Sequence, residues 1–254
     1  MTIDTTALYR LLAWASPAFP TGGFSYSHGL EAAAADGAVH DRATLQTWVA
    51  ATIAHGSGRV DADILCDAWR AAAAGDEPAL AEVNRRGVAY RATAELALES
   101  GQQGAAFMAA YDAAWAAPHP NPLRVNGARE RAGAFTPRPA SGKREGPAPK
   151  AWEGEGICHA AAFGVAASRA GAGLEEALTA YLQAFAANLM SAGLRLGIIG
   201  QSDGQRILAA LEPVVAVSVT ASLAREREDF GSATFALDLA SMAHETLYSR
   251  LFRS

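Results

Sequence analysis

Histidine is the residue type in this 254-residue chain best suited to binding a catalytic metal, and the chain has six. A small helical metalloenzyme would use His28, His55 and His244. His244 and Glu245 begin like the H-E-x-x-H motif of zinc enzymes, but Tyr248 stands where the second histidine must be. Because no ligand spacing joins the three histidines, the sequence assigns no catalytic residue, no metal ligand and no cofactor. The metalloenzyme is kept only as an alternative.

A loop rich in glycine and aromatic residues, from Ser16 to Glu31, resembles two catalytic motifs without matching either. The run GFSYS at 23–27 lacks the final glycine of a nucleophile elbow, and no predicted strand precedes it. The glycine pair at 22–23 is not followed by the Gly-Lys-Ser/Thr of a phosphate-binding loop. The loop is therefore predicted to have a structural or binding role.

Within this loop, Gly22 and Gly23 are predicted to form a turn, because glycine adopts backbone angles closed to other residues. Phe24, Tyr26 and His28 follow the turn. Their aromatic rings either anchor the loop in the core or contact a partner. If they contact a partner, Tyr26 and His28 are expected to be the most exposed polar groups.

The C-terminal segment, residues 241–254, combines arginine with bulky apolar side chains: Tyr248, Arg250, Leu251, Phe252 and Arg253. Chain ends are usually polar and frayed. Arginine and aromatic residues, by contrast, contribute much of the binding energy at protein interfaces. The segment is therefore predicted to bind a partner, and docking onto its own domain is the alternative.

The elements that must position these segments are predicted to be helices in a single all-α domain. Half of the residues are hydrophobic, alanine is abundant, and apolar residues recur at helical spacing in about nine or ten segments. Asp41 is expected to cap one helix that ends at Gly56, and Asp76 another. Apolar residues from Leu80 to Leu98 indicate one continuous helix.

A buried helical hairpin is expected at the centre of this domain. Its first helix starts at Leu174 and is apolar on most faces. A turn at Gly200 leads into the second helix, where Ser202 and Gln205 have the spacing of a capping box. Beyond Pro213, a kinked helix is favoured over a strand.

The net charge, the cysteine count and the hydropathy of the sequence argue against several classes of protein. A net charge of −5 argues against general nucleic-acid binding, and two cysteines are too few for a disulfide framework. No signal pattern is present, and no apolar run reaches the ~20 residues of a membrane span. The chain is therefore expected to be cytoplasmic.

Residues 118–152 interrupt the helical pattern with proline, glycine and arginine. Residues 118–150 hold seven basic and two acidic side chains, a net charge of +5. A segment with so few apolar residues cannot bury enough surface to fold, so a disordered insertion is predicted. The insertion is interpreted as a solvated loop, and the alternative is that its basic residues tether nucleic acid or an acidic partner.

Taken together, several segments resemble the urease accessory protein family UreF. They are SPAFPTGGFSYSHGLE (16–31), RATAELALESGQQG (91–104), GQSDGQ (200–205), SMAHE (241–245) and YSRLFRS (248–254). The resemblance covers nearly the whole chain except the insertion, which is foreign to the family pattern. Ile198-Ile199 also departs from the family, which usually has a Pro-Leu type pair before the glycine.

The resemblance implies an all-helical, non-catalytic chaperone, usually a homodimer, that acts in metallocentre assembly. Members of the family join UreD (also called UreH), recruit the GTPase UreG and help to deliver nickel to apo-urease. In that family the C-terminal tail takes part in complex formation and becomes ordered on partner binding. This role is carried over to Tyr248, Arg250, Leu251, Phe252 and Arg253, and less directly to the loop at Phe24, Tyr26 and His28.

Two mechanisms remain open within this role. The chain acts either as a scaffold that positions the GTPase, or as a regulator of GTP hydrolysis that inserts an arginine, with Arg250 and Arg253 as candidates. Neither nucleic acid nor a membrane is expected among its partners.

Overall fold

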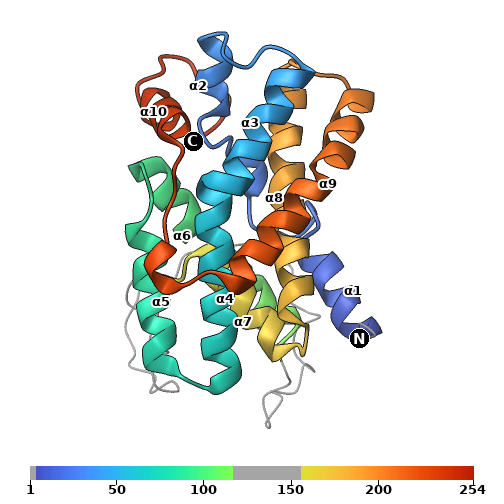
Figure 1. Cartoon of the computed structure of the whole chain (residues 1–254), viewed down its shortest axis with the longest axis vertical. Helices are drawn as coiled ribbons and strands as arrows, with labels where there is room; N and C mark the ends of the chain where they lie inside the picture. The colour runs from blue at the N-terminus through green and yellow to red at the C-terminus, as the bar shows by residue number, and fades with distance from the viewer. Residues whose placement is uncertain (1–3, 117–155) are drawn as a thin grey trace, which may run out of the picture.

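The computed structural model describes residues 4–116 and 156–254, and every regular element in these ranges is a helix (Figure 1). The all-α prediction is therefore confirmed. The predicted insertion at 118–152 lies outside the described residues. The elements in chain order are α1 (Thr5–Trp14), the 3-10 helix η1 (Gly23–Ser25), α2 (Leu30–Ala35), α3 (Arg42–His55), α4 (Ser57–Ala74), α5 (Glu77–Ala89), α6 (Ala94–Ala114), α7 (His159–Arg169), α8 (Leu174–Arg195), α9 (Gln201–Ala224), the 3-10 helix η2 (Arg227–Asp229) and α10 (Phe235–His244).

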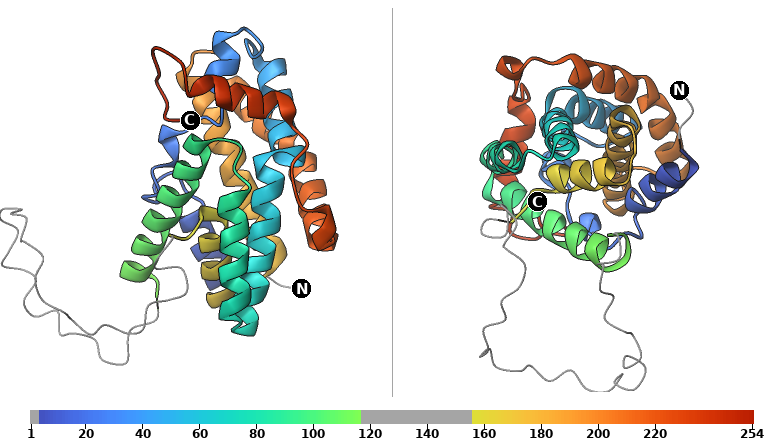
Figure 2. Two further views of the ribbon diagram at one scale, coloured as in Figure 1. Left: turned by 90° about the vertical axis from the view of Figure 1, so that its left-hand side faces the viewer. Right: turned by 90° about the horizontal axis from the view of Figure 1, so that it is seen from below.

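Helix α7 packs against α4, α6 and α8 and, seen from below, lies between them (Figure 2). Its residues from Ala160 to Ala167 are all buried. Gly164 allows α4 to approach closely, because a Cβ atom there would lie 2.7 Å from the Leu65 carbonyl oxygen. Small residues on α7 thus set the spacing of the core helices.

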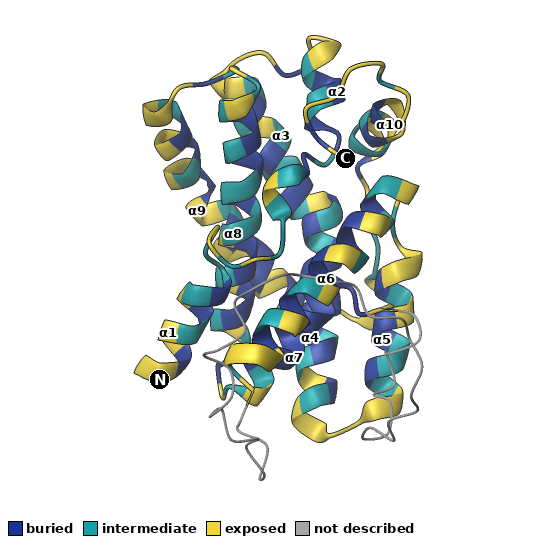
Figure 3. Ribbon diagram, turned by 180° about the vertical axis from the view of Figure 1, so that it is seen from behind, coloured by how far each residue is buried: buried dark blue, intermediate teal, exposed yellow. Residues whose placement is uncertain are grey.

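The expected α8–α9 hairpin is present, but its two helices differ in burial (Figure 3). Helix α8 buries residues along its length, whereas α9 has an exposed face that includes Val217. The run after Pro213 continues α9 as a helix, as favoured from the sequence. Helix α9 is also long and apolar enough to cross a membrane by length and composition, with a mean hydropathy of 1.9. The expectation that no segment reaches this length was therefore wrong, although core helices pass the same test.

The capping box predicted for Ser202 and Gln205 is not formed. Helix α9 starts at Gln201, two residues earlier than this box requires, with Gly200 as its N-cap and no side-chain cap. The reason lies in the preceding turn: Gly197 ends α8 at a φ of +74°, and the chain re-enters helical geometry at Gln201. Ser202 is then already inside the first turn and cannot act as the cap.

The helix expected from Leu80 to Leu98 is two helices, α5 and α6. Thr93 has an extended backbone and its hydroxyl accepts a hydrogen bond from the Leu96 N–H at 3.2 Å, which starts α6. Tyr90 and Leu98, which belong to the apolar pattern that indicated one helix, are both exposed. The caps at Asp41 and Asp76 form as predicted, at α3 and α5.

Candidate functional site

The glycine-rich loop forms the turn that was expected at Gly22 and Gly23. Gly22 has a φ of +77°, and η1 begins at the next residue. Gly29 has a φ of +75°, and a Cβ atom there would lie 2.7 Å from the backbone nitrogen of Ser241 on α10. This second glycine therefore lets the loop pass directly against α10.

The prediction that Tyr26 and His28 are exposed is wrong. Tyr26 is buried and its hydroxyl donates to Gln102 at 2.7 Å. His28 places its Nε2 atom 3.0 Å from Glu99, and its ring packs against Phe185 at 4.8 Å between centroids. These side chains anchor the loop, the other interpretation left open by the sequence. Phe24, in contrast, is 68% exposed.

Electrostatics fix His28 in this position. Burial by itself lowers the pKa of His28, but the negative charge of Glu99 and its hydrogen bond outweigh burial, so the pKa is raised. Glu99 also accepts hydrogen bonds from Gln103 at 2.8 Å and from the Ser254 hydroxyl at 2.8 Å. One carboxylate therefore joins the loop, α6 and the C-terminal segment.

The C-terminal segment lies along the loop, and the two pair through their backbones. The Arg253 N–H donates to the Ser25 carbonyl at 2.8 Å, and the Ser27 N–H donates to the Ser254 backbone oxygen at 2.8 Å. The Ser27 hydroxyl donates to the same Ser254 oxygen. The two segments predicted separately as partner-binding regions are thus neighbours in space.

Glu31, at the start of α2, is the second carboxylate that binds this segment. It accepts the Leu251 N–H at 2.6 Å and the Phe252 N–H at 2.9 Å, and it lies 3.1 Å from His244 Nε2. Burial raises the pKa of Glu31, but the two backbone donors and His244 outweigh it, so the pKa is lowered. The ionised carboxylate is therefore the stable form in this position.

Glu95 on α6 is the third carboxylate of this cluster. It lies 2.7 Å from His244 Nδ1 and forms an ion pair with Arg250. Both ring nitrogens of the buried His244 thus contact carboxylates on different helices. His244 is therefore held in place by two carboxylates, from α2 and α6.

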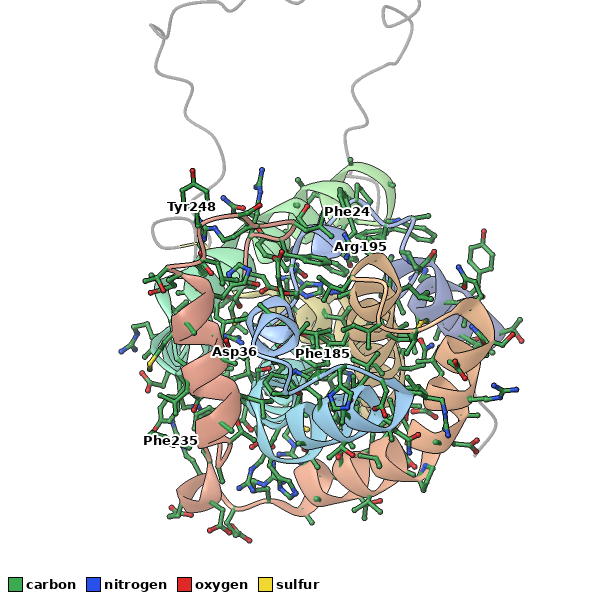
Figure 4. All side chains as sticks on the ribbon, turned by 90° about the horizontal axis from the view of Figure 1, so that it is seen from above. Phe24, Asp36, Phe185, Arg195, Phe235 and Tyr248 are labelled. Carbon is green, nitrogen blue, oxygen red and sulfur yellow. The ribbon has the colours of Figure 1, made fainter. Side chains whose placement is uncertain are left out.

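Side chains of the C-terminal segment divide into buried and exposed sets. Phe252 is buried, and the Arg195 guanidinium lies 4.2 Å from the centre of its ring. Tyr248 is fully exposed and Leu251 is 60% exposed. Figure 4 shows Tyr248 pointing away from the body of the protein. Docking onto its own domain, the alternative considered from the sequence, therefore applies to Phe252, and Tyr248 and Leu251 stay accessible.

Helix α10, just before this segment, has its apolar face on the outside. Its buried residues are Ser241 and His244, whereas Phe235, Leu239 and Met242 are 77%, 48% and 48% exposed. These three residues are spaced i, i+4, i+7 and share one face. Figure 4 shows the Phe235 side chain directed outward. An exposed apolar face of this kind is a candidate interaction surface.

A cavity of about 160 Å³ lies beneath the loop, and its lining includes His28, Asp61, Arg91, Glu99 and His159. Asp61 pairs with Arg91 at 2.7 Å and accepts the Tyr181 hydroxyl at 2.9 Å. Burial lowers the pKa of His159 to about 4, so this ring is neutral at physiological pH. The charged groups here are matched in pairs.

The three histidines of the metalloenzyme hypothesis do not form a common site in the structure. His28 binds Glu99, His244 binds Glu31 and Glu95, and His55 is exposed at the end of α3. Within residues 4–116 and 156–254, no group of three or more histidine, cysteine or carboxylate side chains is arranged to hold a metal ion.

Sequence reasoning assigned no role to Glu31, Glu95 or Glu99, although these carboxylates organise the site. Glu95 and Glu99 are four residues apart and therefore lie on one face of α6. This spacing, within an otherwise apolar and small-residue stretch, was the available signal.

The described residues define a helical protein in which the loop packs against both α10 and the C-terminal segment. The model of the UreF family matches residues 39–212. The chain belongs to the UreF family of urease accessory proteins.

Similar full-length proteins, each named urease accessory protein UreF, support this assignment. The protein from Granulibacter bethesdensis is 45% identical over 248 residues, which cover 98% of this chain and 94% of that protein. The protein from Rhodopseudomonas palustris is 42% identical, covering 99% of this chain and 93% of its own length. The protein from a Bradyrhizobium species is 41% identical, covering 99% and 93%.

Proposed function

We propose that this chain is a non-catalytic adaptor in urease maturation. It binds UreD (UreH), recruits the GTPase UreG and helps to deliver nickel, the cargo, to apo-urease in the cytoplasm, acting as a homodimer within the larger complex. Family membership supports the accessory role. The observation that carries the adaptor mechanism is the outward apolar face of α10, which is followed in the chain by the exposed Tyr248 and Leu251.

This surface suits a protein partner for two reasons. Large apolar and aromatic side chains, when buried at an interface, contribute much of its binding energy. The C-terminal segment is also held in place by Glu31, Glu95 and Glu99, so little entropy is lost in fixing it when a partner binds. Among the described residues, the surface offers contacts and no metal-binding cluster.

The alternative mechanism, an arginine inserted into the GTPase, is less well supported by the geometry. Arg250 is paired with Glu95 and would have to leave this carboxylate to reach a nucleotide. The Arg253 side chain hydrogen-bonds the Tyr26 hydroxyl of its own loop. The scaffold mechanism is therefore preferred.

Co-purification with UreD and UreG tests the proposal. We expect the wild-type chain to form the complex, and Phe235→Ser combined with Leu239→Ser and Met242→Ser to reduce recovery of UreD at least about tenfold. The matched control is Val217→Ser on α9, which is 69% exposed and should leave recovery unchanged. Circular dichroism shows whether each variant stays helical.

The possible outcomes distinguish a failure of the adaptor function from a failure of α10 as the contact surface. If the wild-type chain captures neither UreD nor UreG, the adaptor proposal is wrong. If it captures both and the α10 variant does so equally well, α10 is not the contact surface. A chain ending at Ser249 then shows whether residues 250–254 supply the contact instead.

A further inference from the structure

Three buried polar side chains that line the 160 Å³ cavity each have an atom without a hydrogen-bond partner among the described residues. These atoms are Nε1 of Trp14, Nδ1 of His28 and the hydroxyl oxygen of Ser100. Trp14 is 3% exposed, Ser100 is 7% exposed and the His28 side chain is 10% exposed. Leaving a buried polar group unpaired costs free energy, so such groups normally have a partner. Their gathering on one cavity wall indicates a molecule that pairs with them.

The three side chains can all act as hydrogen-bond donors. The Trp14 indole nitrogen only donates, and the Ser100 hydroxyl can rotate to donate. The pKa of His28 is raised because Glu99 outweighs the effect of burial, so at about pH 6 both ring nitrogens carry a proton. Nε2 then donates to Glu99 and Nδ1 keeps a second proton. A complementary ligand must therefore offer an acceptor, such as a carbonyl oxygen.

The charges on the cavity wall favour a ligand without charge. Glu99 neutralises protonated His28, and Asp61 pairs with Arg91 at 2.7 Å. Burial lowers the pKa of His159 to about 4, so this ring contributes no charge at about pH 6. A charged ligand would enter the buried site without a counter-charge, which carries a large desolvation cost.

Aromatic rings form much of the remaining wall. The Phe163 ring lies 6.4 Å from Trp14 and 5.4 Å from Tyr181 between centroids, and Phe185 also lines the cavity. A cavity of about this volume can hold one benzene-sized ring. The lining includes Phe24, which is 68% exposed, so the cavity reaches the surface at the loop.

We propose that this cavity is a binding site for an uncharged, planar molecule about the size of one aromatic ring that carries a carbonyl oxygen. The polar end of the ligand pairs with donors among Trp14, His28 and Ser100, and its flat face packs against the aromatic wall. The site lies within one chain and goes beyond the adaptor function, because it needs no partner protein.

An NMR titration of the full-length chain with benzamide at about pH 6 tests the site. We expect the Trp14 indole N–H signal to shift with a Kd of about 1 mM or tighter. The Trp69 indole donates to the Ala172 carbonyl at 3.0 Å and lies outside the cavity lining, so its signal is the internal reference and should not move.

Two related probes test the chemistry of the ligand. Toluene lacks the carbonyl oxygen, and benzoate carries a negative charge on a body of similar size. Each should bind at least about fivefold more weakly than benzamide, because the first leaves the donors unpaired and the second brings an unmatched charge.

Two variants test the location. Ser100→Ala removes one donor and should weaken benzamide binding at least about threefold, whereas Ser202→Ala on the exposed surface of α9 is the matched control and should change nothing. Ala184→Leu places a larger side chain in the cavity wall and should abolish the shift of the Trp14 signal. Circular dichroism shows whether this variant stays helical, and if it does not, the comparison of the two serine variants still decides.

The proposal is overturned if the Trp14 signal does not move at about 10 mM benzamide, because the polar atoms would then be paired with water alone. Toluene or benzoate binding as tightly as benzamide would also overturn it, since the proposed ligand chemistry would be wrong. Equal binding by the Ser100 and Ser202 variants would place the ligand elsewhere. None of these measurements requires UreD or UreG, so their outcome is independent of whether the adaptor function holds.

Discussion

Glu31 and Phe252 are 221 positions apart in the sequence, yet the Glu31 carboxylate accepts the Phe252 N–H at 2.9 Å. This contact joins the conspicuous loop of the sequence to its conspicuous C-terminal segment. The two segments pack against each other, so a substitution in either one should also alter the structure of the other.

The buried pair of Asp61 and Arg91 should be essential for stability. Arg91→Met leaves a buried carboxylate whose charge is uncompensated, which costs about 3–5 kcal/mol in the free energy of unfolding. Urea denaturation followed by circular dichroism measures this loss. The control is Arg42→Met, which breaks an exposed pair with Asp203 and should cost less than about 1 kcal/mol. Equal effects of the two variants would contradict the assignment.

Two glycines on α6 should respond oppositely to alanine. A Cβ atom at Gly104 would lie 1.9 Å from the Ile157 carbonyl oxygen, so Gly104→Ala should destabilise the protein by about 1–3 kcal/mol or more. Gly101 has nothing within 4 Å of the added carbon, and Gly101→Ala should stabilise by about 0.5–1 kcal/mol. Thermal unfolding of both variants gives the sign. Stabilisation by both would mean that α6 does not approach residue 157 this closely.

The protonation of His28 should make stability fall as pH rises. Its folded pKa is raised above the ordinary value of about 6.5. A raised pKa contributes stability that is fully present below the unfolded pKa and is lost as pH increases through the folded pKa. The unfolding free energy of wild type should therefore decrease above about pH 6.5 more steeply than that of His28→Gln.

An NMR titration of the histidine ring protons checks the same point directly. The His28 signal should titrate above its ordinary range, whereas His159, whose pKa burial lowers to about 4, should not titrate between about pH 5.5 and 8. A His28 signal that titrates below about pH 6 would contradict the role of Glu99.

Substitution of Tyr248 should affect partner binding, whereas substitution of Phe252 should affect the structure of the C-terminal segment. Tyr248→Ala removes a fully exposed side chain and should change the free energy of unfolding by less than about 0.5 kcal/mol, while weakening recovery of UreD. Phe252→Ala should make the C-terminal segment sensitive to limited proteolysis, because its buried anchor is lost. If only the Tyr248 variant became sensitive to protease, Tyr248 and not Phe252 would be the residue that holds the segment in place.

Much of the helical architecture is predictable from local sequence. Helical spacing of apolar residues and the caps at Asp41 and Asp76 give α3 and the start of α5, because both signals depend on neighbours within one or two turns. The break between α5 and α6 was missed, since the Thr93 cap competes with an uninterrupted apolar pattern. The Ser202 capping box failed because the turn at Gly197 sets where α9 begins.

The sequence by itself determined the helical class and the resemblance to the UreF family, and it singled out the loop and the C-terminal segment as predicted partner-binding regions. Tertiary structure alone decided that these segments bind each other, that Tyr26 and His28 face inward, and that α10 turns its apolar face outward. The physical reason is the sequence separation of the residues that interact. Helix formation depends on residues three or four positions apart, whereas the carboxylates Glu31, Glu95 and Glu99 meet residues some 150 to 220 positions away only after the helices have packed.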